Sequence, residues 1–317
     1  MGGKNATETL PADDAGIARA AAVLRDGGLV AVPTETVYGL AARADSAEAV
    51  ARIYAAKGRP DFNPLIVHVR DAAQAGRYAE LAGDAALVAE RVWPGPLTLV
   101  LPRRADAGLA EAVTAGLPTV ALRAPAHPAM RALLAACEFP LAAPSANRSG
   151  FISPTTAAHV LASLDGRIDL VLDAGPCEAG LESTILAIRG DGEWDELRPG
   201  PIDLAALRER LFAQPFTAGA GASGIEAPGQ LASHYAPGKP LRLEAQDAEA
   251  DEFLIGFGPV GGDCSLSPAG DRAEAAARLY ACLHEAARSA KPRIAVAPVP
   301  HEGLGKAIND RLRRAAA

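Results

Sequence analysis

Short apolar runs alternate with amphipathic segments over the first two-thirds of the chain. Each run consists almost entirely of aliphatic residues and ends near a glycine, a proline or a polar residue, which is the pattern of a buried strand. Strands are therefore predicted at residues 29–33, 65–69, 97–101, 119–122, 141–143, 170–172 and 184–188.

Helical patterns fall between several of these strands. Asp13 is a candidate cap for a helix that ends at Gly27-Gly28, and Ser46 is a candidate cap for the next helix, which ends near Lys57. Further helices are predicted near residues 84–92, 127–136, 155–163 and 203–212. The alternation predicts an α/β fold with a twisted, open sheet. Because helices do not separate all of the strands, we expect a mixed sheet with some antiparallel pairs.

The composition changes at residue 213. Residues 213–240 are rich in glycine and proline, which is typical of a linker. After them, apolar and amphipathic segments predict a second, smaller α/β unit, with elements at residues 253–257, 272–288, 293–297 and 305–314. The predicted organisation is a first domain of residues 1–212, a linker of residues 213–240 and a C-terminal domain of residues 241–317.

Size and composition narrow the class of protein. The chain has 317 residues, of which 49% are hydrophobic and 22% charged, as in soluble globular proteins of one or two domains. No apolar run reaches membrane-spanning length, and the N-terminus lacks the apolar core of a secretory signal. The four cysteines are scattered, without the spacing of a zinc knuckle or a disulfide framework, so we expect a reducing cytoplasm. The net charge of −7 argues against a broad nucleic-acid-binding surface but not against a local basic crevice.

Polar side chains gather where predicted strands and helices end. The densest group is Lys57-Gly-Arg-Pro-Asp-Phe-Asn-Pro-Leu-Ile-Val-His68, and a second group is Pro144-Ser-Ala-Asn-Arg-Ser-Gly150. In an open α/β sheet, ligands bind at the carboxyl ends of strands, and cationic and hydroxyl side chains suit phosphates and carboxylates. The sequence therefore predicts an enzyme that acts on an anionic small molecule, with a nucleotide favoured.

Further polar positions follow the same pattern along the chain. They are Thr34-Glu-Thr after the first strand, Arg123 at the end of another, Ser153 at the expected start of a helix whose free amides could accept anionic oxygens, Glu182-Ser-Thr, Arg198, and His234-Tyr235 in the linker. The linker pair could fold over a ligand as a lid. The phosphate-loop pattern GxxxxGK(S/T) is missing, and no GxGxxG follows a strand, so side chains and scattered turns must hold a nucleotide.

Each group also has a purely structural interpretation. Lys57 and Arg59 could complement the dipole of the preceding helix. His68 could be a core histidine, Arg123 could form a surface ion pair, and the turn at Thr34 could be a helix cap. The functional interpretation rests on the number of polar groups at presumed strand ends.

Several ordered motifs resemble those of the YrdC-like family. They are Pro33-Thr-Glu-Thr-Val-Tyr-Gly, Lys57-Gly-Arg-Pro with Asn63-Pro-Leu, Trp93-Pro-Gly-Pro-Leu-Thr, Arg123-Ala-Pro, Pro144-Ser-Ala-Asn-Arg-Ser-Gly, Glu182-Ser-Thr-Ile and Leu197-Arg-Pro-Gly. His234-Tyr-Ala-Pro, followed by a small Rossmann-like α/β unit, resembles the long two-domain branch, the threonylcarbamoyl-AMP synthases of Sua type. The resemblance covers residues 13–240 by motif and the remainder by size and placement.

The resemblance implies the roles of individual residues. Lys57 and Arg59 are implied as catalytic and as facing the phosphates of ATP. The threonine substrate is implied to lie among Thr36, His68, Arg123, Ala143 and Ser183, with its carboxylate on Arg123. ATP is implied to contact Arg59, Asn63, Thr119, Ser145, Asn147, Ser153, Arg198 and Tyr235.

The resemblance also implies a reaction and its partners. L-threonine, bicarbonate and ATP, the last with Mg²⁺, would give threonylcarbamoyl-AMP and pyrophosphate, and no other cofactor is expected. Charge that builds on the phosphoryl oxygens would be stabilised by fixed cations. No residue type demands the role of general base, so simple positioning of the substrates is equally consistent. The product would pass to a downstream threonylcarbamoyl transferase complex for tRNA modification, and weak tRNA binding stays open.

The sequence argues against two other functions. A carbamoyl-transfer module of the hydrogenase-maturation type would require paired CxxC zinc sites ahead of the motif region, and this chain contains no CxxC. A non-catalytic RNA-binding module is opposed by the net charge of −7 and by the lack of aromatic stacking motifs.

Overall fold

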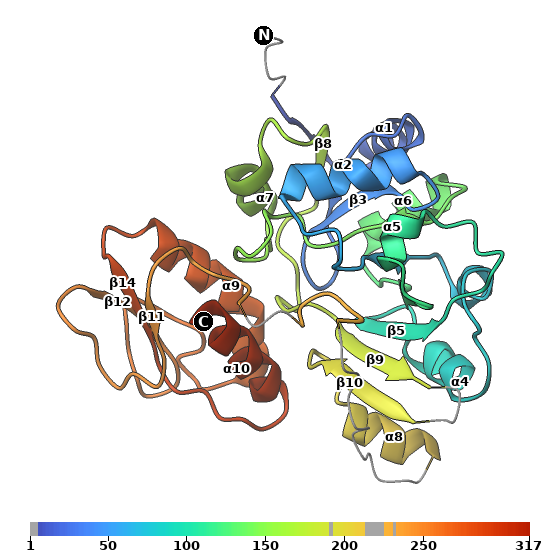
Figure 1. The fold of residues 1–317 in the computed structure, drawn as a ribbon. Helices are drawn as coiled ribbons and strands as arrows, with labels where there is room; N and C mark the ends of the chain where they lie inside the picture. Colours follow the sequence, from blue (N-terminus) through green and yellow to red (C-terminus); the bar gives the residue numbers. More distant parts are fainter. Residues whose placement is uncertain (1–5, 190–192, 213–224, 231–232) are drawn as a thin grey trace.

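Two sheets of unequal size organise the protein (Figure 1). The computed structural model describes residues 6–189, 193–212, 225–230 and 233–317. Within these residues, the larger sheet has ten strands in the order β1-β8-β2-β3-β7-β4-β6-β5-β9-β10, and the smaller has four in the order β11-β14-β12-β13. Much of the linker predicted at residues 213–240 lies outside the described residues.

The strands of both sheets are short. Their bounds are β1 Glu8–Pro11, β2 Val30–Val32, β3 Gly39–Arg43, β4 Ile66–His68, β5 Leu97–Pro102, β6 Thr119–Arg123, β7 Leu141–Ala142, β8 Leu170–Asp173, β9 Thr184–Ile188, β10 Trp194–Arg198, β11 Leu241–Arg242, β12 Glu252–Gly256, β13 Cys264–Ser265 and β14 Arg293–Val296.

The described helices are mostly one to four turns long. Their bounds are α1 Asp14–Arg25, α2 Ala47–Lys57, α3 Ala72–Ala75, α4 Gly83–Val92, α5 Glu111–Thr114, α6 Pro128–Ala136, α7 Ala157–Leu164, α8 Leu204–Phe212, α9 Arg272–Arg288 and α10 Leu304–Ala315.

Capping residues set the ends of the first two helices, as predicted. The side chain of Asp13 accepts a hydrogen bond from the amide of Gly16 at the start of α1. Ser46 caps α2 in the same way, and Gly58 ends α2 in the left-handed conformation with φ of 60°. Glycine suits this position because it has no Cβ to oppose a positive φ.

The larger sheet is mixed, which confirms the prediction from sequence. β4 and β6 are parallel, with His68 directly opposite Arg123, whereas β7 is antiparallel to both of its neighbours, β3 and β4. Strand directions therefore oppose one another in the middle of the sheet.

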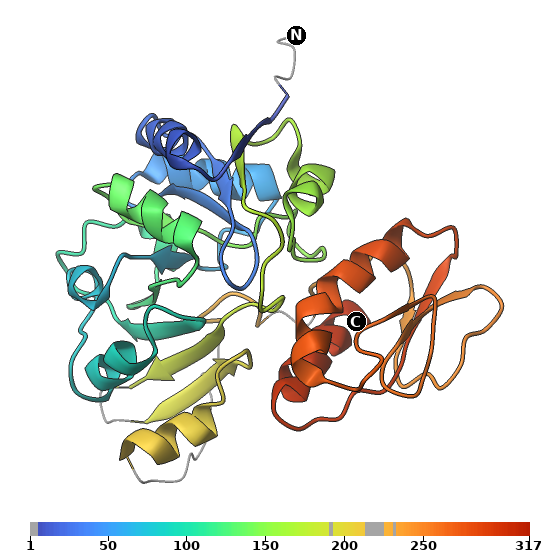
Figure 2. The same ribbon diagram turned by 180° about the vertical axis from the view of Figure 1, so that it is seen from behind.

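The sheet separates two apolar layers, because successive side chains of a strand point to opposite faces. Val30 and Val32 of β2 pack with α1 and α6, whereas Leu29 and Ala31 pack in the layer that contains α2 and α7. Figures 1 and 2, seen from opposite sides, show α2 and α6 on opposite faces of the sheet.

The smaller sheet is parallel throughout. The helices α9 and α10 pack against it and lie between it and the first domain (Figure 1). Its core includes Ile255, Leu279, Ile294 and Ile308.

Several elements differ from the prediction. The strands β1, β3, β10, β11 and β13 and the short helices α3 and α5 are absent from the prediction. The helix expected from residue 155 begins at Ala157 as α7, and the side chain of Thr156 already accepts a hydrogen bond from the amide of His159. Ser153 therefore lies ahead of the helix, and the expectation that it opens a helix with free amides is wrong.

Among the helices of the described residues, none has the length and the apolar character that crossing a bilayer requires.

Candidate functional site

A cavity lies over the region where β3, β7, β4 and β6 are neighbours and is bordered by Pro228, Gly229, His234 and Tyr235. It contains about 540 Å³ of space between atoms, part of it open to solvent. Its lining comprises Thr34, Thr36, Val37, Gly39, Arg59, Ile66, His68, Arg123, Ala143, Pro144, Ser145, Glu182, Ser183, Arg198, Pro228, Gly229, His234 and Tyr235.

Most of the residues predicted for the site lie in this lining. They are Thr36, Arg59, His68, Arg123, Ala143, Ser145, Ser183, Arg198 and Tyr235. Others predicted for the site do not line the cavity: Lys57, Asn63, Thr119, Asn147 and Ser153.

The convergence does not arise from the carboxyl ends of parallel strands alone. The parallel pair β4 and β6 does bring His68 and Arg123 side by side. β7, which leads to Ser145, runs in the opposite direction to β4. The cavity therefore spreads across the face of a mixed sheet, and the simple rule for parallel sheets explains only part of it.

Arg123 is held at the centre of a small polar cluster. Its Nη1 donates to the hydroxyl of Thr36 at 2.9 Å, and its Nη2 contacts Oε1 of Glu35 at 2.6 Å. Burial raises the pKa of Glu35, but the charge and hydrogen bond of Arg123 outweigh burial and lower it. The pair therefore fixes the guanidinium on the cavity wall as a charged group.

His68 is neutral in this environment. Burial and the neighbouring charge of Arg123 lower the pKa of His68 to about 3. Its Nδ1 is buried without a hydrogen-bond partner among the described residues. The imidazole can therefore position a ligand but is a weak base at neutral pH.

Arg59 follows the left-handed Gly58 and turns back on its own loop. Its Nε donates to the carbonyl of Asn63 at 3.1 Å and its Nη2 to the carbonyl of Pro64 at 2.9 Å. Burial lowers the pKa of Arg59 to about 10, so the guanidinium stays charged at neutral pH.

Lys57 lies behind the cavity wall. Its Nζ donates to the backbone carbonyls of Ser145 and Asn147 and so ties the end of α2 to the turn that follows β7. Burial, with the nearby charge of Arg59, lowers the pKa of Lys57 well below its usual range. In this conformation Lys57 supports Ser145 rather than facing the cavity.

Arg198 and Ser183 form another part of the cavity lining. A β-bulge between Glu196 and Arg198 interrupts the register of β10 with β9, and bulges commonly redirect a side chain. Arg198 donates to the carbonyl of Ser183 at 3.1 Å and to its hydroxyl at 3.1 Å. The hydroxyl of Ser183 also lies 2.8 Å from that of Thr98.

The absence of a side chain at Gly229 leaves room for the side chain of Arg198. It has φ of 87°, and a Cβ built there would lie 3.0 Å from Cδ of Arg198 and 3.2 Å from the hydroxyl of Tyr235. Any larger residue would be strained and would crowd both side chains.

Tyr235 covers the cavity in an unusual backbone conformation, with φ of 65°. Such conformations cost free energy in bulky residues and are commonly kept at functional sites. The next residue, Ala236, donates to the carbonyl of Gly150, and the amide of His234 donates to the carbonyl of Arg314 in α10. This segment is therefore held by both domains.

Unpaired buried polar atoms gather around the cavity. Among the described residues that line it, His68 Nδ1, His234 Nδ1 and Tyr235 OH have no hydrogen-bond partner. Buried polar atoms are normally hydrogen-bonded, so such a cluster indicates a place for a ligand or ordered water.

Two carboxylates were noted in the sequence but not assigned to the site. Glu35 holds Arg123, and Glu182 borders the cavity directly. Their positions inside the Thr-Glu-Thr and Glu-Ser-Thr patterns are the sequence signal that could have assigned them to the site. The carboxylate of Glu182 would repel an anionic ligand unless a positive charge compensates it.

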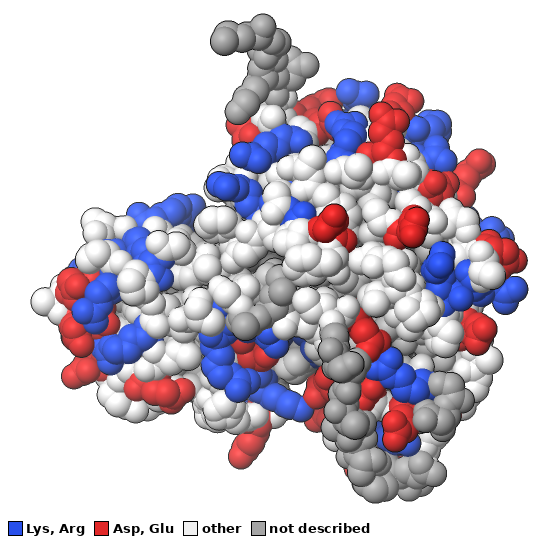
Figure 3. All heavy atoms as spheres, in the orientation of Figure 1, with Lys and Arg blue, Asp and Glu red and all other residues white. Residues whose placement is uncertain are grey.

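The charged groups of the site are buried, in contrast to the outer surface. Figure 3 shows acidic and basic side chains interspersed over much of the face that it presents. Arg59, Arg123 and Arg198 are each less than 10% exposed. The site therefore offers a local anion pocket rather than a broad basic surface.

The donor set does not resemble a metal cage. Among the described residues, no three His, Cys, Asp or Glu side chains are grouped so that they could hold a metal ion.

Comparison with known proteins gives consistent matches over the whole chain. A family model described as "Telomere recombination" (Sua5_yciO_yrdC) matches residues 22–200, and one described as "Threonylcarbamoyl-AMP synthase, C-terminal domain" matches residues 202–317. The chain is 41% identical to the threonylcarbamoyl-AMP synthase of Bacillus subtilis, over 98% of this chain and 95% of the relative. It is 38% identical to that of Pyrococcus abyssi, over 93% of this chain and 92% of the relative.

A solved structure also matches the whole chain. The crystal structure of P. abyssi Sua5 in complex with L-threonine has a TM-score of 0.86 to this structure at 34% identity. The match covers 98% of this chain and 96% of the P. abyssi chain. The match extends over both sheets.

Proposed function

The chain belongs to the threonylcarbamoyl-AMP synthase family, in its two-domain Sua5 type, and we propose that the cavity described above holds its substrates, L-threonine and ATP. The enzyme makes threonylcarbamoyl-AMP, the intermediate for threonylcarbamoyladenosine in tRNA. The observation that carries the placement is the convergence of three buried arginines on one cavity.

L-threonine is placed at the Arg123 side of the cavity. Arg123 is fixed by Glu35 and Thr36, so its remaining N–H groups can take the substrate carboxylate as a fork. His68, Ala143 and Ser183 complete this part of the wall. The threonine complex of the P. abyssi relative supports this substrate.

ATP is placed at the Arg59 and Arg198 side. Both guanidinium groups are buried and oriented by backbone carbonyls, which suits them to phosphate oxygens. Ser145 lies on the same wall, and Lys57 acts by holding the turn that carries it. Asn63, Thr119, Asn147 and Ser153 stay candidates for nucleotide contact.

The chemistry requires positioning more than acid–base catalysis. The free amine of threonine combines with bicarbonate to give a carbamate and water. A carbamate oxygen then attacks the α-phosphorus of ATP, and the bond to the leaving pyrophosphate breaks. Arg59 and Arg198 stabilise the charge on phosphate and pyrophosphate oxygens. Neutral His68, with its pKa of about 3, is a poor general base, so orientation of the substrates carries the reaction.

Mg²⁺ would come with ATP. Phosphate oxygens and water would be its ligands, and it would offset the charge of the triphosphate.

Several further assignments belong to the same proposal. We propose residues 1–212 as the catalytic domain, residues 213–240 as a connection whose Tyr235 segment closes over ATP, and residues 241–317 as a separate domain. The two separate sheets support a division into two domains, and the family models divide the chain between residues 200 and 202. A cytoplasmic location and transfer of the product to a threonylcarbamoyl transferase complex fit the same function.

The test is release of pyrophosphate from ATP in the presence of bicarbonate, Mg²⁺ and one amino acid at a time. Release that requires L-threonine, and that is not obtained with D-threonine, supports the proposal. Pyrophosphate release that ignores the amino acid, or RNA binding with no turnover, would contradict it.

A further inference from the structure

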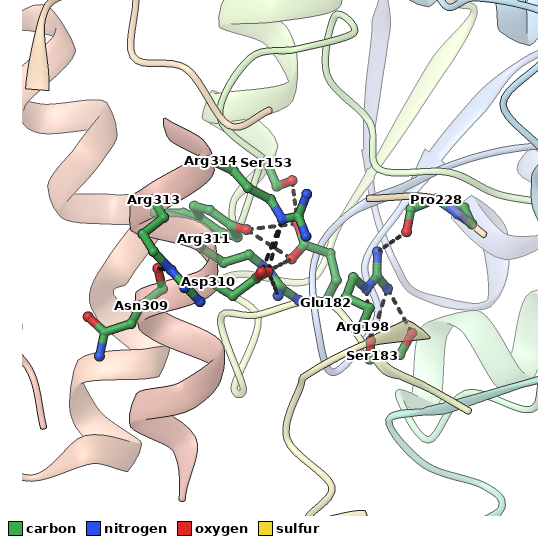
Figure 4. A network of polar contacts seen from close by, with 11 residues as sticks. Ser153, Glu182, Ser183, Arg198, Pro228, Asn309, Asp310, Arg311, Arg313 and Arg314 are labelled. Atoms are coloured by element: carbon green, nitrogen blue, oxygen red, sulfur yellow. Dashed lines mark hydrogen bonds and ion pairs between the residues drawn. The ribbon is translucent and has the colours of Figure 1, made fainter. Parts of the chain in front are cut away.

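The carboxylate of Glu182 borders the cavity of the first domain, but its principal partners come from the second domain (Figure 4). Its Oε2 accepts from Nε of Arg311 at 2.9 Å and from the hydroxyl of Tyr280 at 2.8 Å. Its Oε1 accepts from the hydroxyl of Ser153 at 2.6 Å. Arg311 belongs to α10 and Tyr280 to α9, so two helices of the second domain reach the wall of the site.

Arg311 is fully buried and makes two further contacts besides the one with Glu182. Its side chain is 0% exposed, and Nη1 is held by Asp310 at 2.8 Å. Its guanidinium carbon lies 5.5 Å from the centre of the Tyr235 ring, a distance that allows a cation–π contact. The second domain therefore touches both Glu182 and the residue that covers the cavity.

Glu182 is coupled to the proposed substrate contacts, Ser183 on the threonine side and Arg198 on the ATP side, through its neighbour in sequence. Ser183 follows it directly, and Arg198 donates to both the carbonyl and the hydroxyl of Ser183. A shift of the Glu182 backbone would therefore move Ser183 and Arg198, and a change in its charge would alter the electrostatic potential at both. A negative charge beside a site for phosphates also repels the ligand unless it is compensated.

We propose that Arg311 and Tyr280 are positioning residues of the nucleotide site, which act through Glu182 on Ser183 and Arg198. The proposal rests on the placement of ATP given above. It assigns the second domain a direct part in the reaction: α9 and α10 supply the counter-charge and the hydroxyl that hold a cavity-wall carboxylate in place. Removing one partner of a buried ion pair leaves the other charge uncompensated, which costs more than the pair itself contributes.

The ionisation of Glu182 provides a specific signature. Burial raises the pKa of Glu182, but the charges of Arg311 and Arg198 and the hydrogen bond from Ser153 lower it to about 2. The other titratable groups that face it are Tyr280, Tyr235, His234 and, beyond Arg311, Asp310. With Arg311 removed, the pKa of Glu182 should rise, so that the carboxylate becomes protonated as the pH is lowered from neutral.

The experiment compares the wild-type enzyme with Arg311→Met across pH 6 to 8.5. At pH 8.5 we expect kcat/KM for ATP to fall by about tenfold or more in the variant. The ratio of variant to wild-type activity should rise as the pH falls, because a protonated Glu182 no longer repels phosphate. In the double variant Glu182→Gln/Arg311→Met the ratio should not depend on pH.

The matched control is Lys306→Met on the same helix. Lys306 joins α10 to Glu196 of the first domain at 2.6 Å, but its side chain is 62% exposed. The Lys306→Met variant tests whether the loss of any contact between the two domains lowers kcat/KM for ATP as Arg311→Met does. We expect activity close to that of the wild type, because exposed ion pairs contribute little.

The outcomes separate the two proposals. A wild-type enzyme without threonine-dependent pyrophosphate release would overturn the proposed function. An active wild type, with Arg311→Met equal to Lys306→Met and a ratio independent of pH, would overturn the role of Arg311. If Arg311→Met does not fold, Tyr280→Phe, which loses a single hydroxyl, should raise the KM for ATP by about threefold or more. An unchanged KM in Tyr280→Phe would then contradict the proposal.

Discussion

Single residues in the cavity are oriented before any ligand arrives. Arg59 is bound by two carbonyls of its own loop, Arg123 by Glu35 and Thr36, and Arg198 by Ser183. A guanidinium that already has a fixed orientation loses little entropy when it binds an oxyanion. This preorganisation is what transition-state stabilisation by charged groups requires.

Arg59→Ala should lower turnover more than tenfold, in keeping with the loss of one charged transition-state contact, and leave the fold intact. Arg59 makes its hydrogen bonds within its own loop, so its removal disturbs few other elements. The measurement is threonine-dependent pyrophosphate release together with the thermal unfolding midpoint. Arg52→Ala is the matched control, because Arg52 lies on α2, the helix just before the Arg59 loop, and pairs with Asp169 at the surface. A fall in stability without a fall in turnover would assign Arg59 to structure.

Lys57→Met should behave differently from Arg59→Ala. Nζ of Lys57 is bonded to the carbonyls of Ser145 and Asn147, and methionine would leave both acceptors without that donor. We expect a loss of about 1–3 kcal/mol in the free energy of unfolding, as well as lower turnover. Chemical denaturation and the same pyrophosphate assay measure the two effects. Full stability with lost turnover would instead favour direct contact between Lys57 and ATP.

At the scale of elements, the loop after α2 depends on the conformation of Gly58. Alanine in the left-handed region costs about 1–2 kcal/mol relative to its usual conformations, and no atom lies within 4 Å of a Cβ placed there. Gly58→Ala should therefore lower the unfolding free energy by about 1 kcal/mol through strain alone. Gly261→Ala is the control, since the space around Gly261 is equally open and its φ is not in the positive region. Equal unfolding midpoints for both variants would contradict the role of Gly58.

The sequence predicted elements well where local signals were strong. Asp13, Ser46 and the glycines that follow marked α1 and α2, because caps act within a single turn of helix. β3 and β10 were missed: Gly39–Arg43 has no β-branched residue, and Trp194–Arg198 carries two acidic residues in its middle. Both strands are defined by their partners in the sheet, and such pairing depends on tertiary context.

The candidate site was likewise predicted where the signal was local and missed where it depended on distant partners. Motifs at strand ends identified Arg123, Ser145 and Ser183, which do line the cavity. The roles of Lys57 and Glu182 could not be read from their positions, because their partners lie 88 and 129 residues away in the chain. Long-range pairing of buried charges is a property of the folded molecule.

At the scale of the whole molecule, Glu182 links the stability of the protein to the contact between its domains. The pKa of Glu182 is lowered from 4.5 to about 2 in the folded state. The contribution of Glu182 to the free energy of unfolding is therefore fully present above about pH 4.5 and is lost as the pH falls through about 2. A shift of this size corresponds to about 3 kcal/mol.

Glu182→Gln should remove this dependence on pH. Above about pH 5 the variant should unfold at a lower temperature than the wild type, because Arg311 keeps a buried charge without its partner. The difference should close as the pH falls toward 2, where Glu182 of the wild type is itself protonated. Glu302→Gln is the matched control: Glu302 pairs with Arg272 but is 88% exposed, so we expect no such difference. A gap between wild type and Glu182→Gln that stays constant down to pH 2 would show that the carboxylate charge does not hold the two domains together.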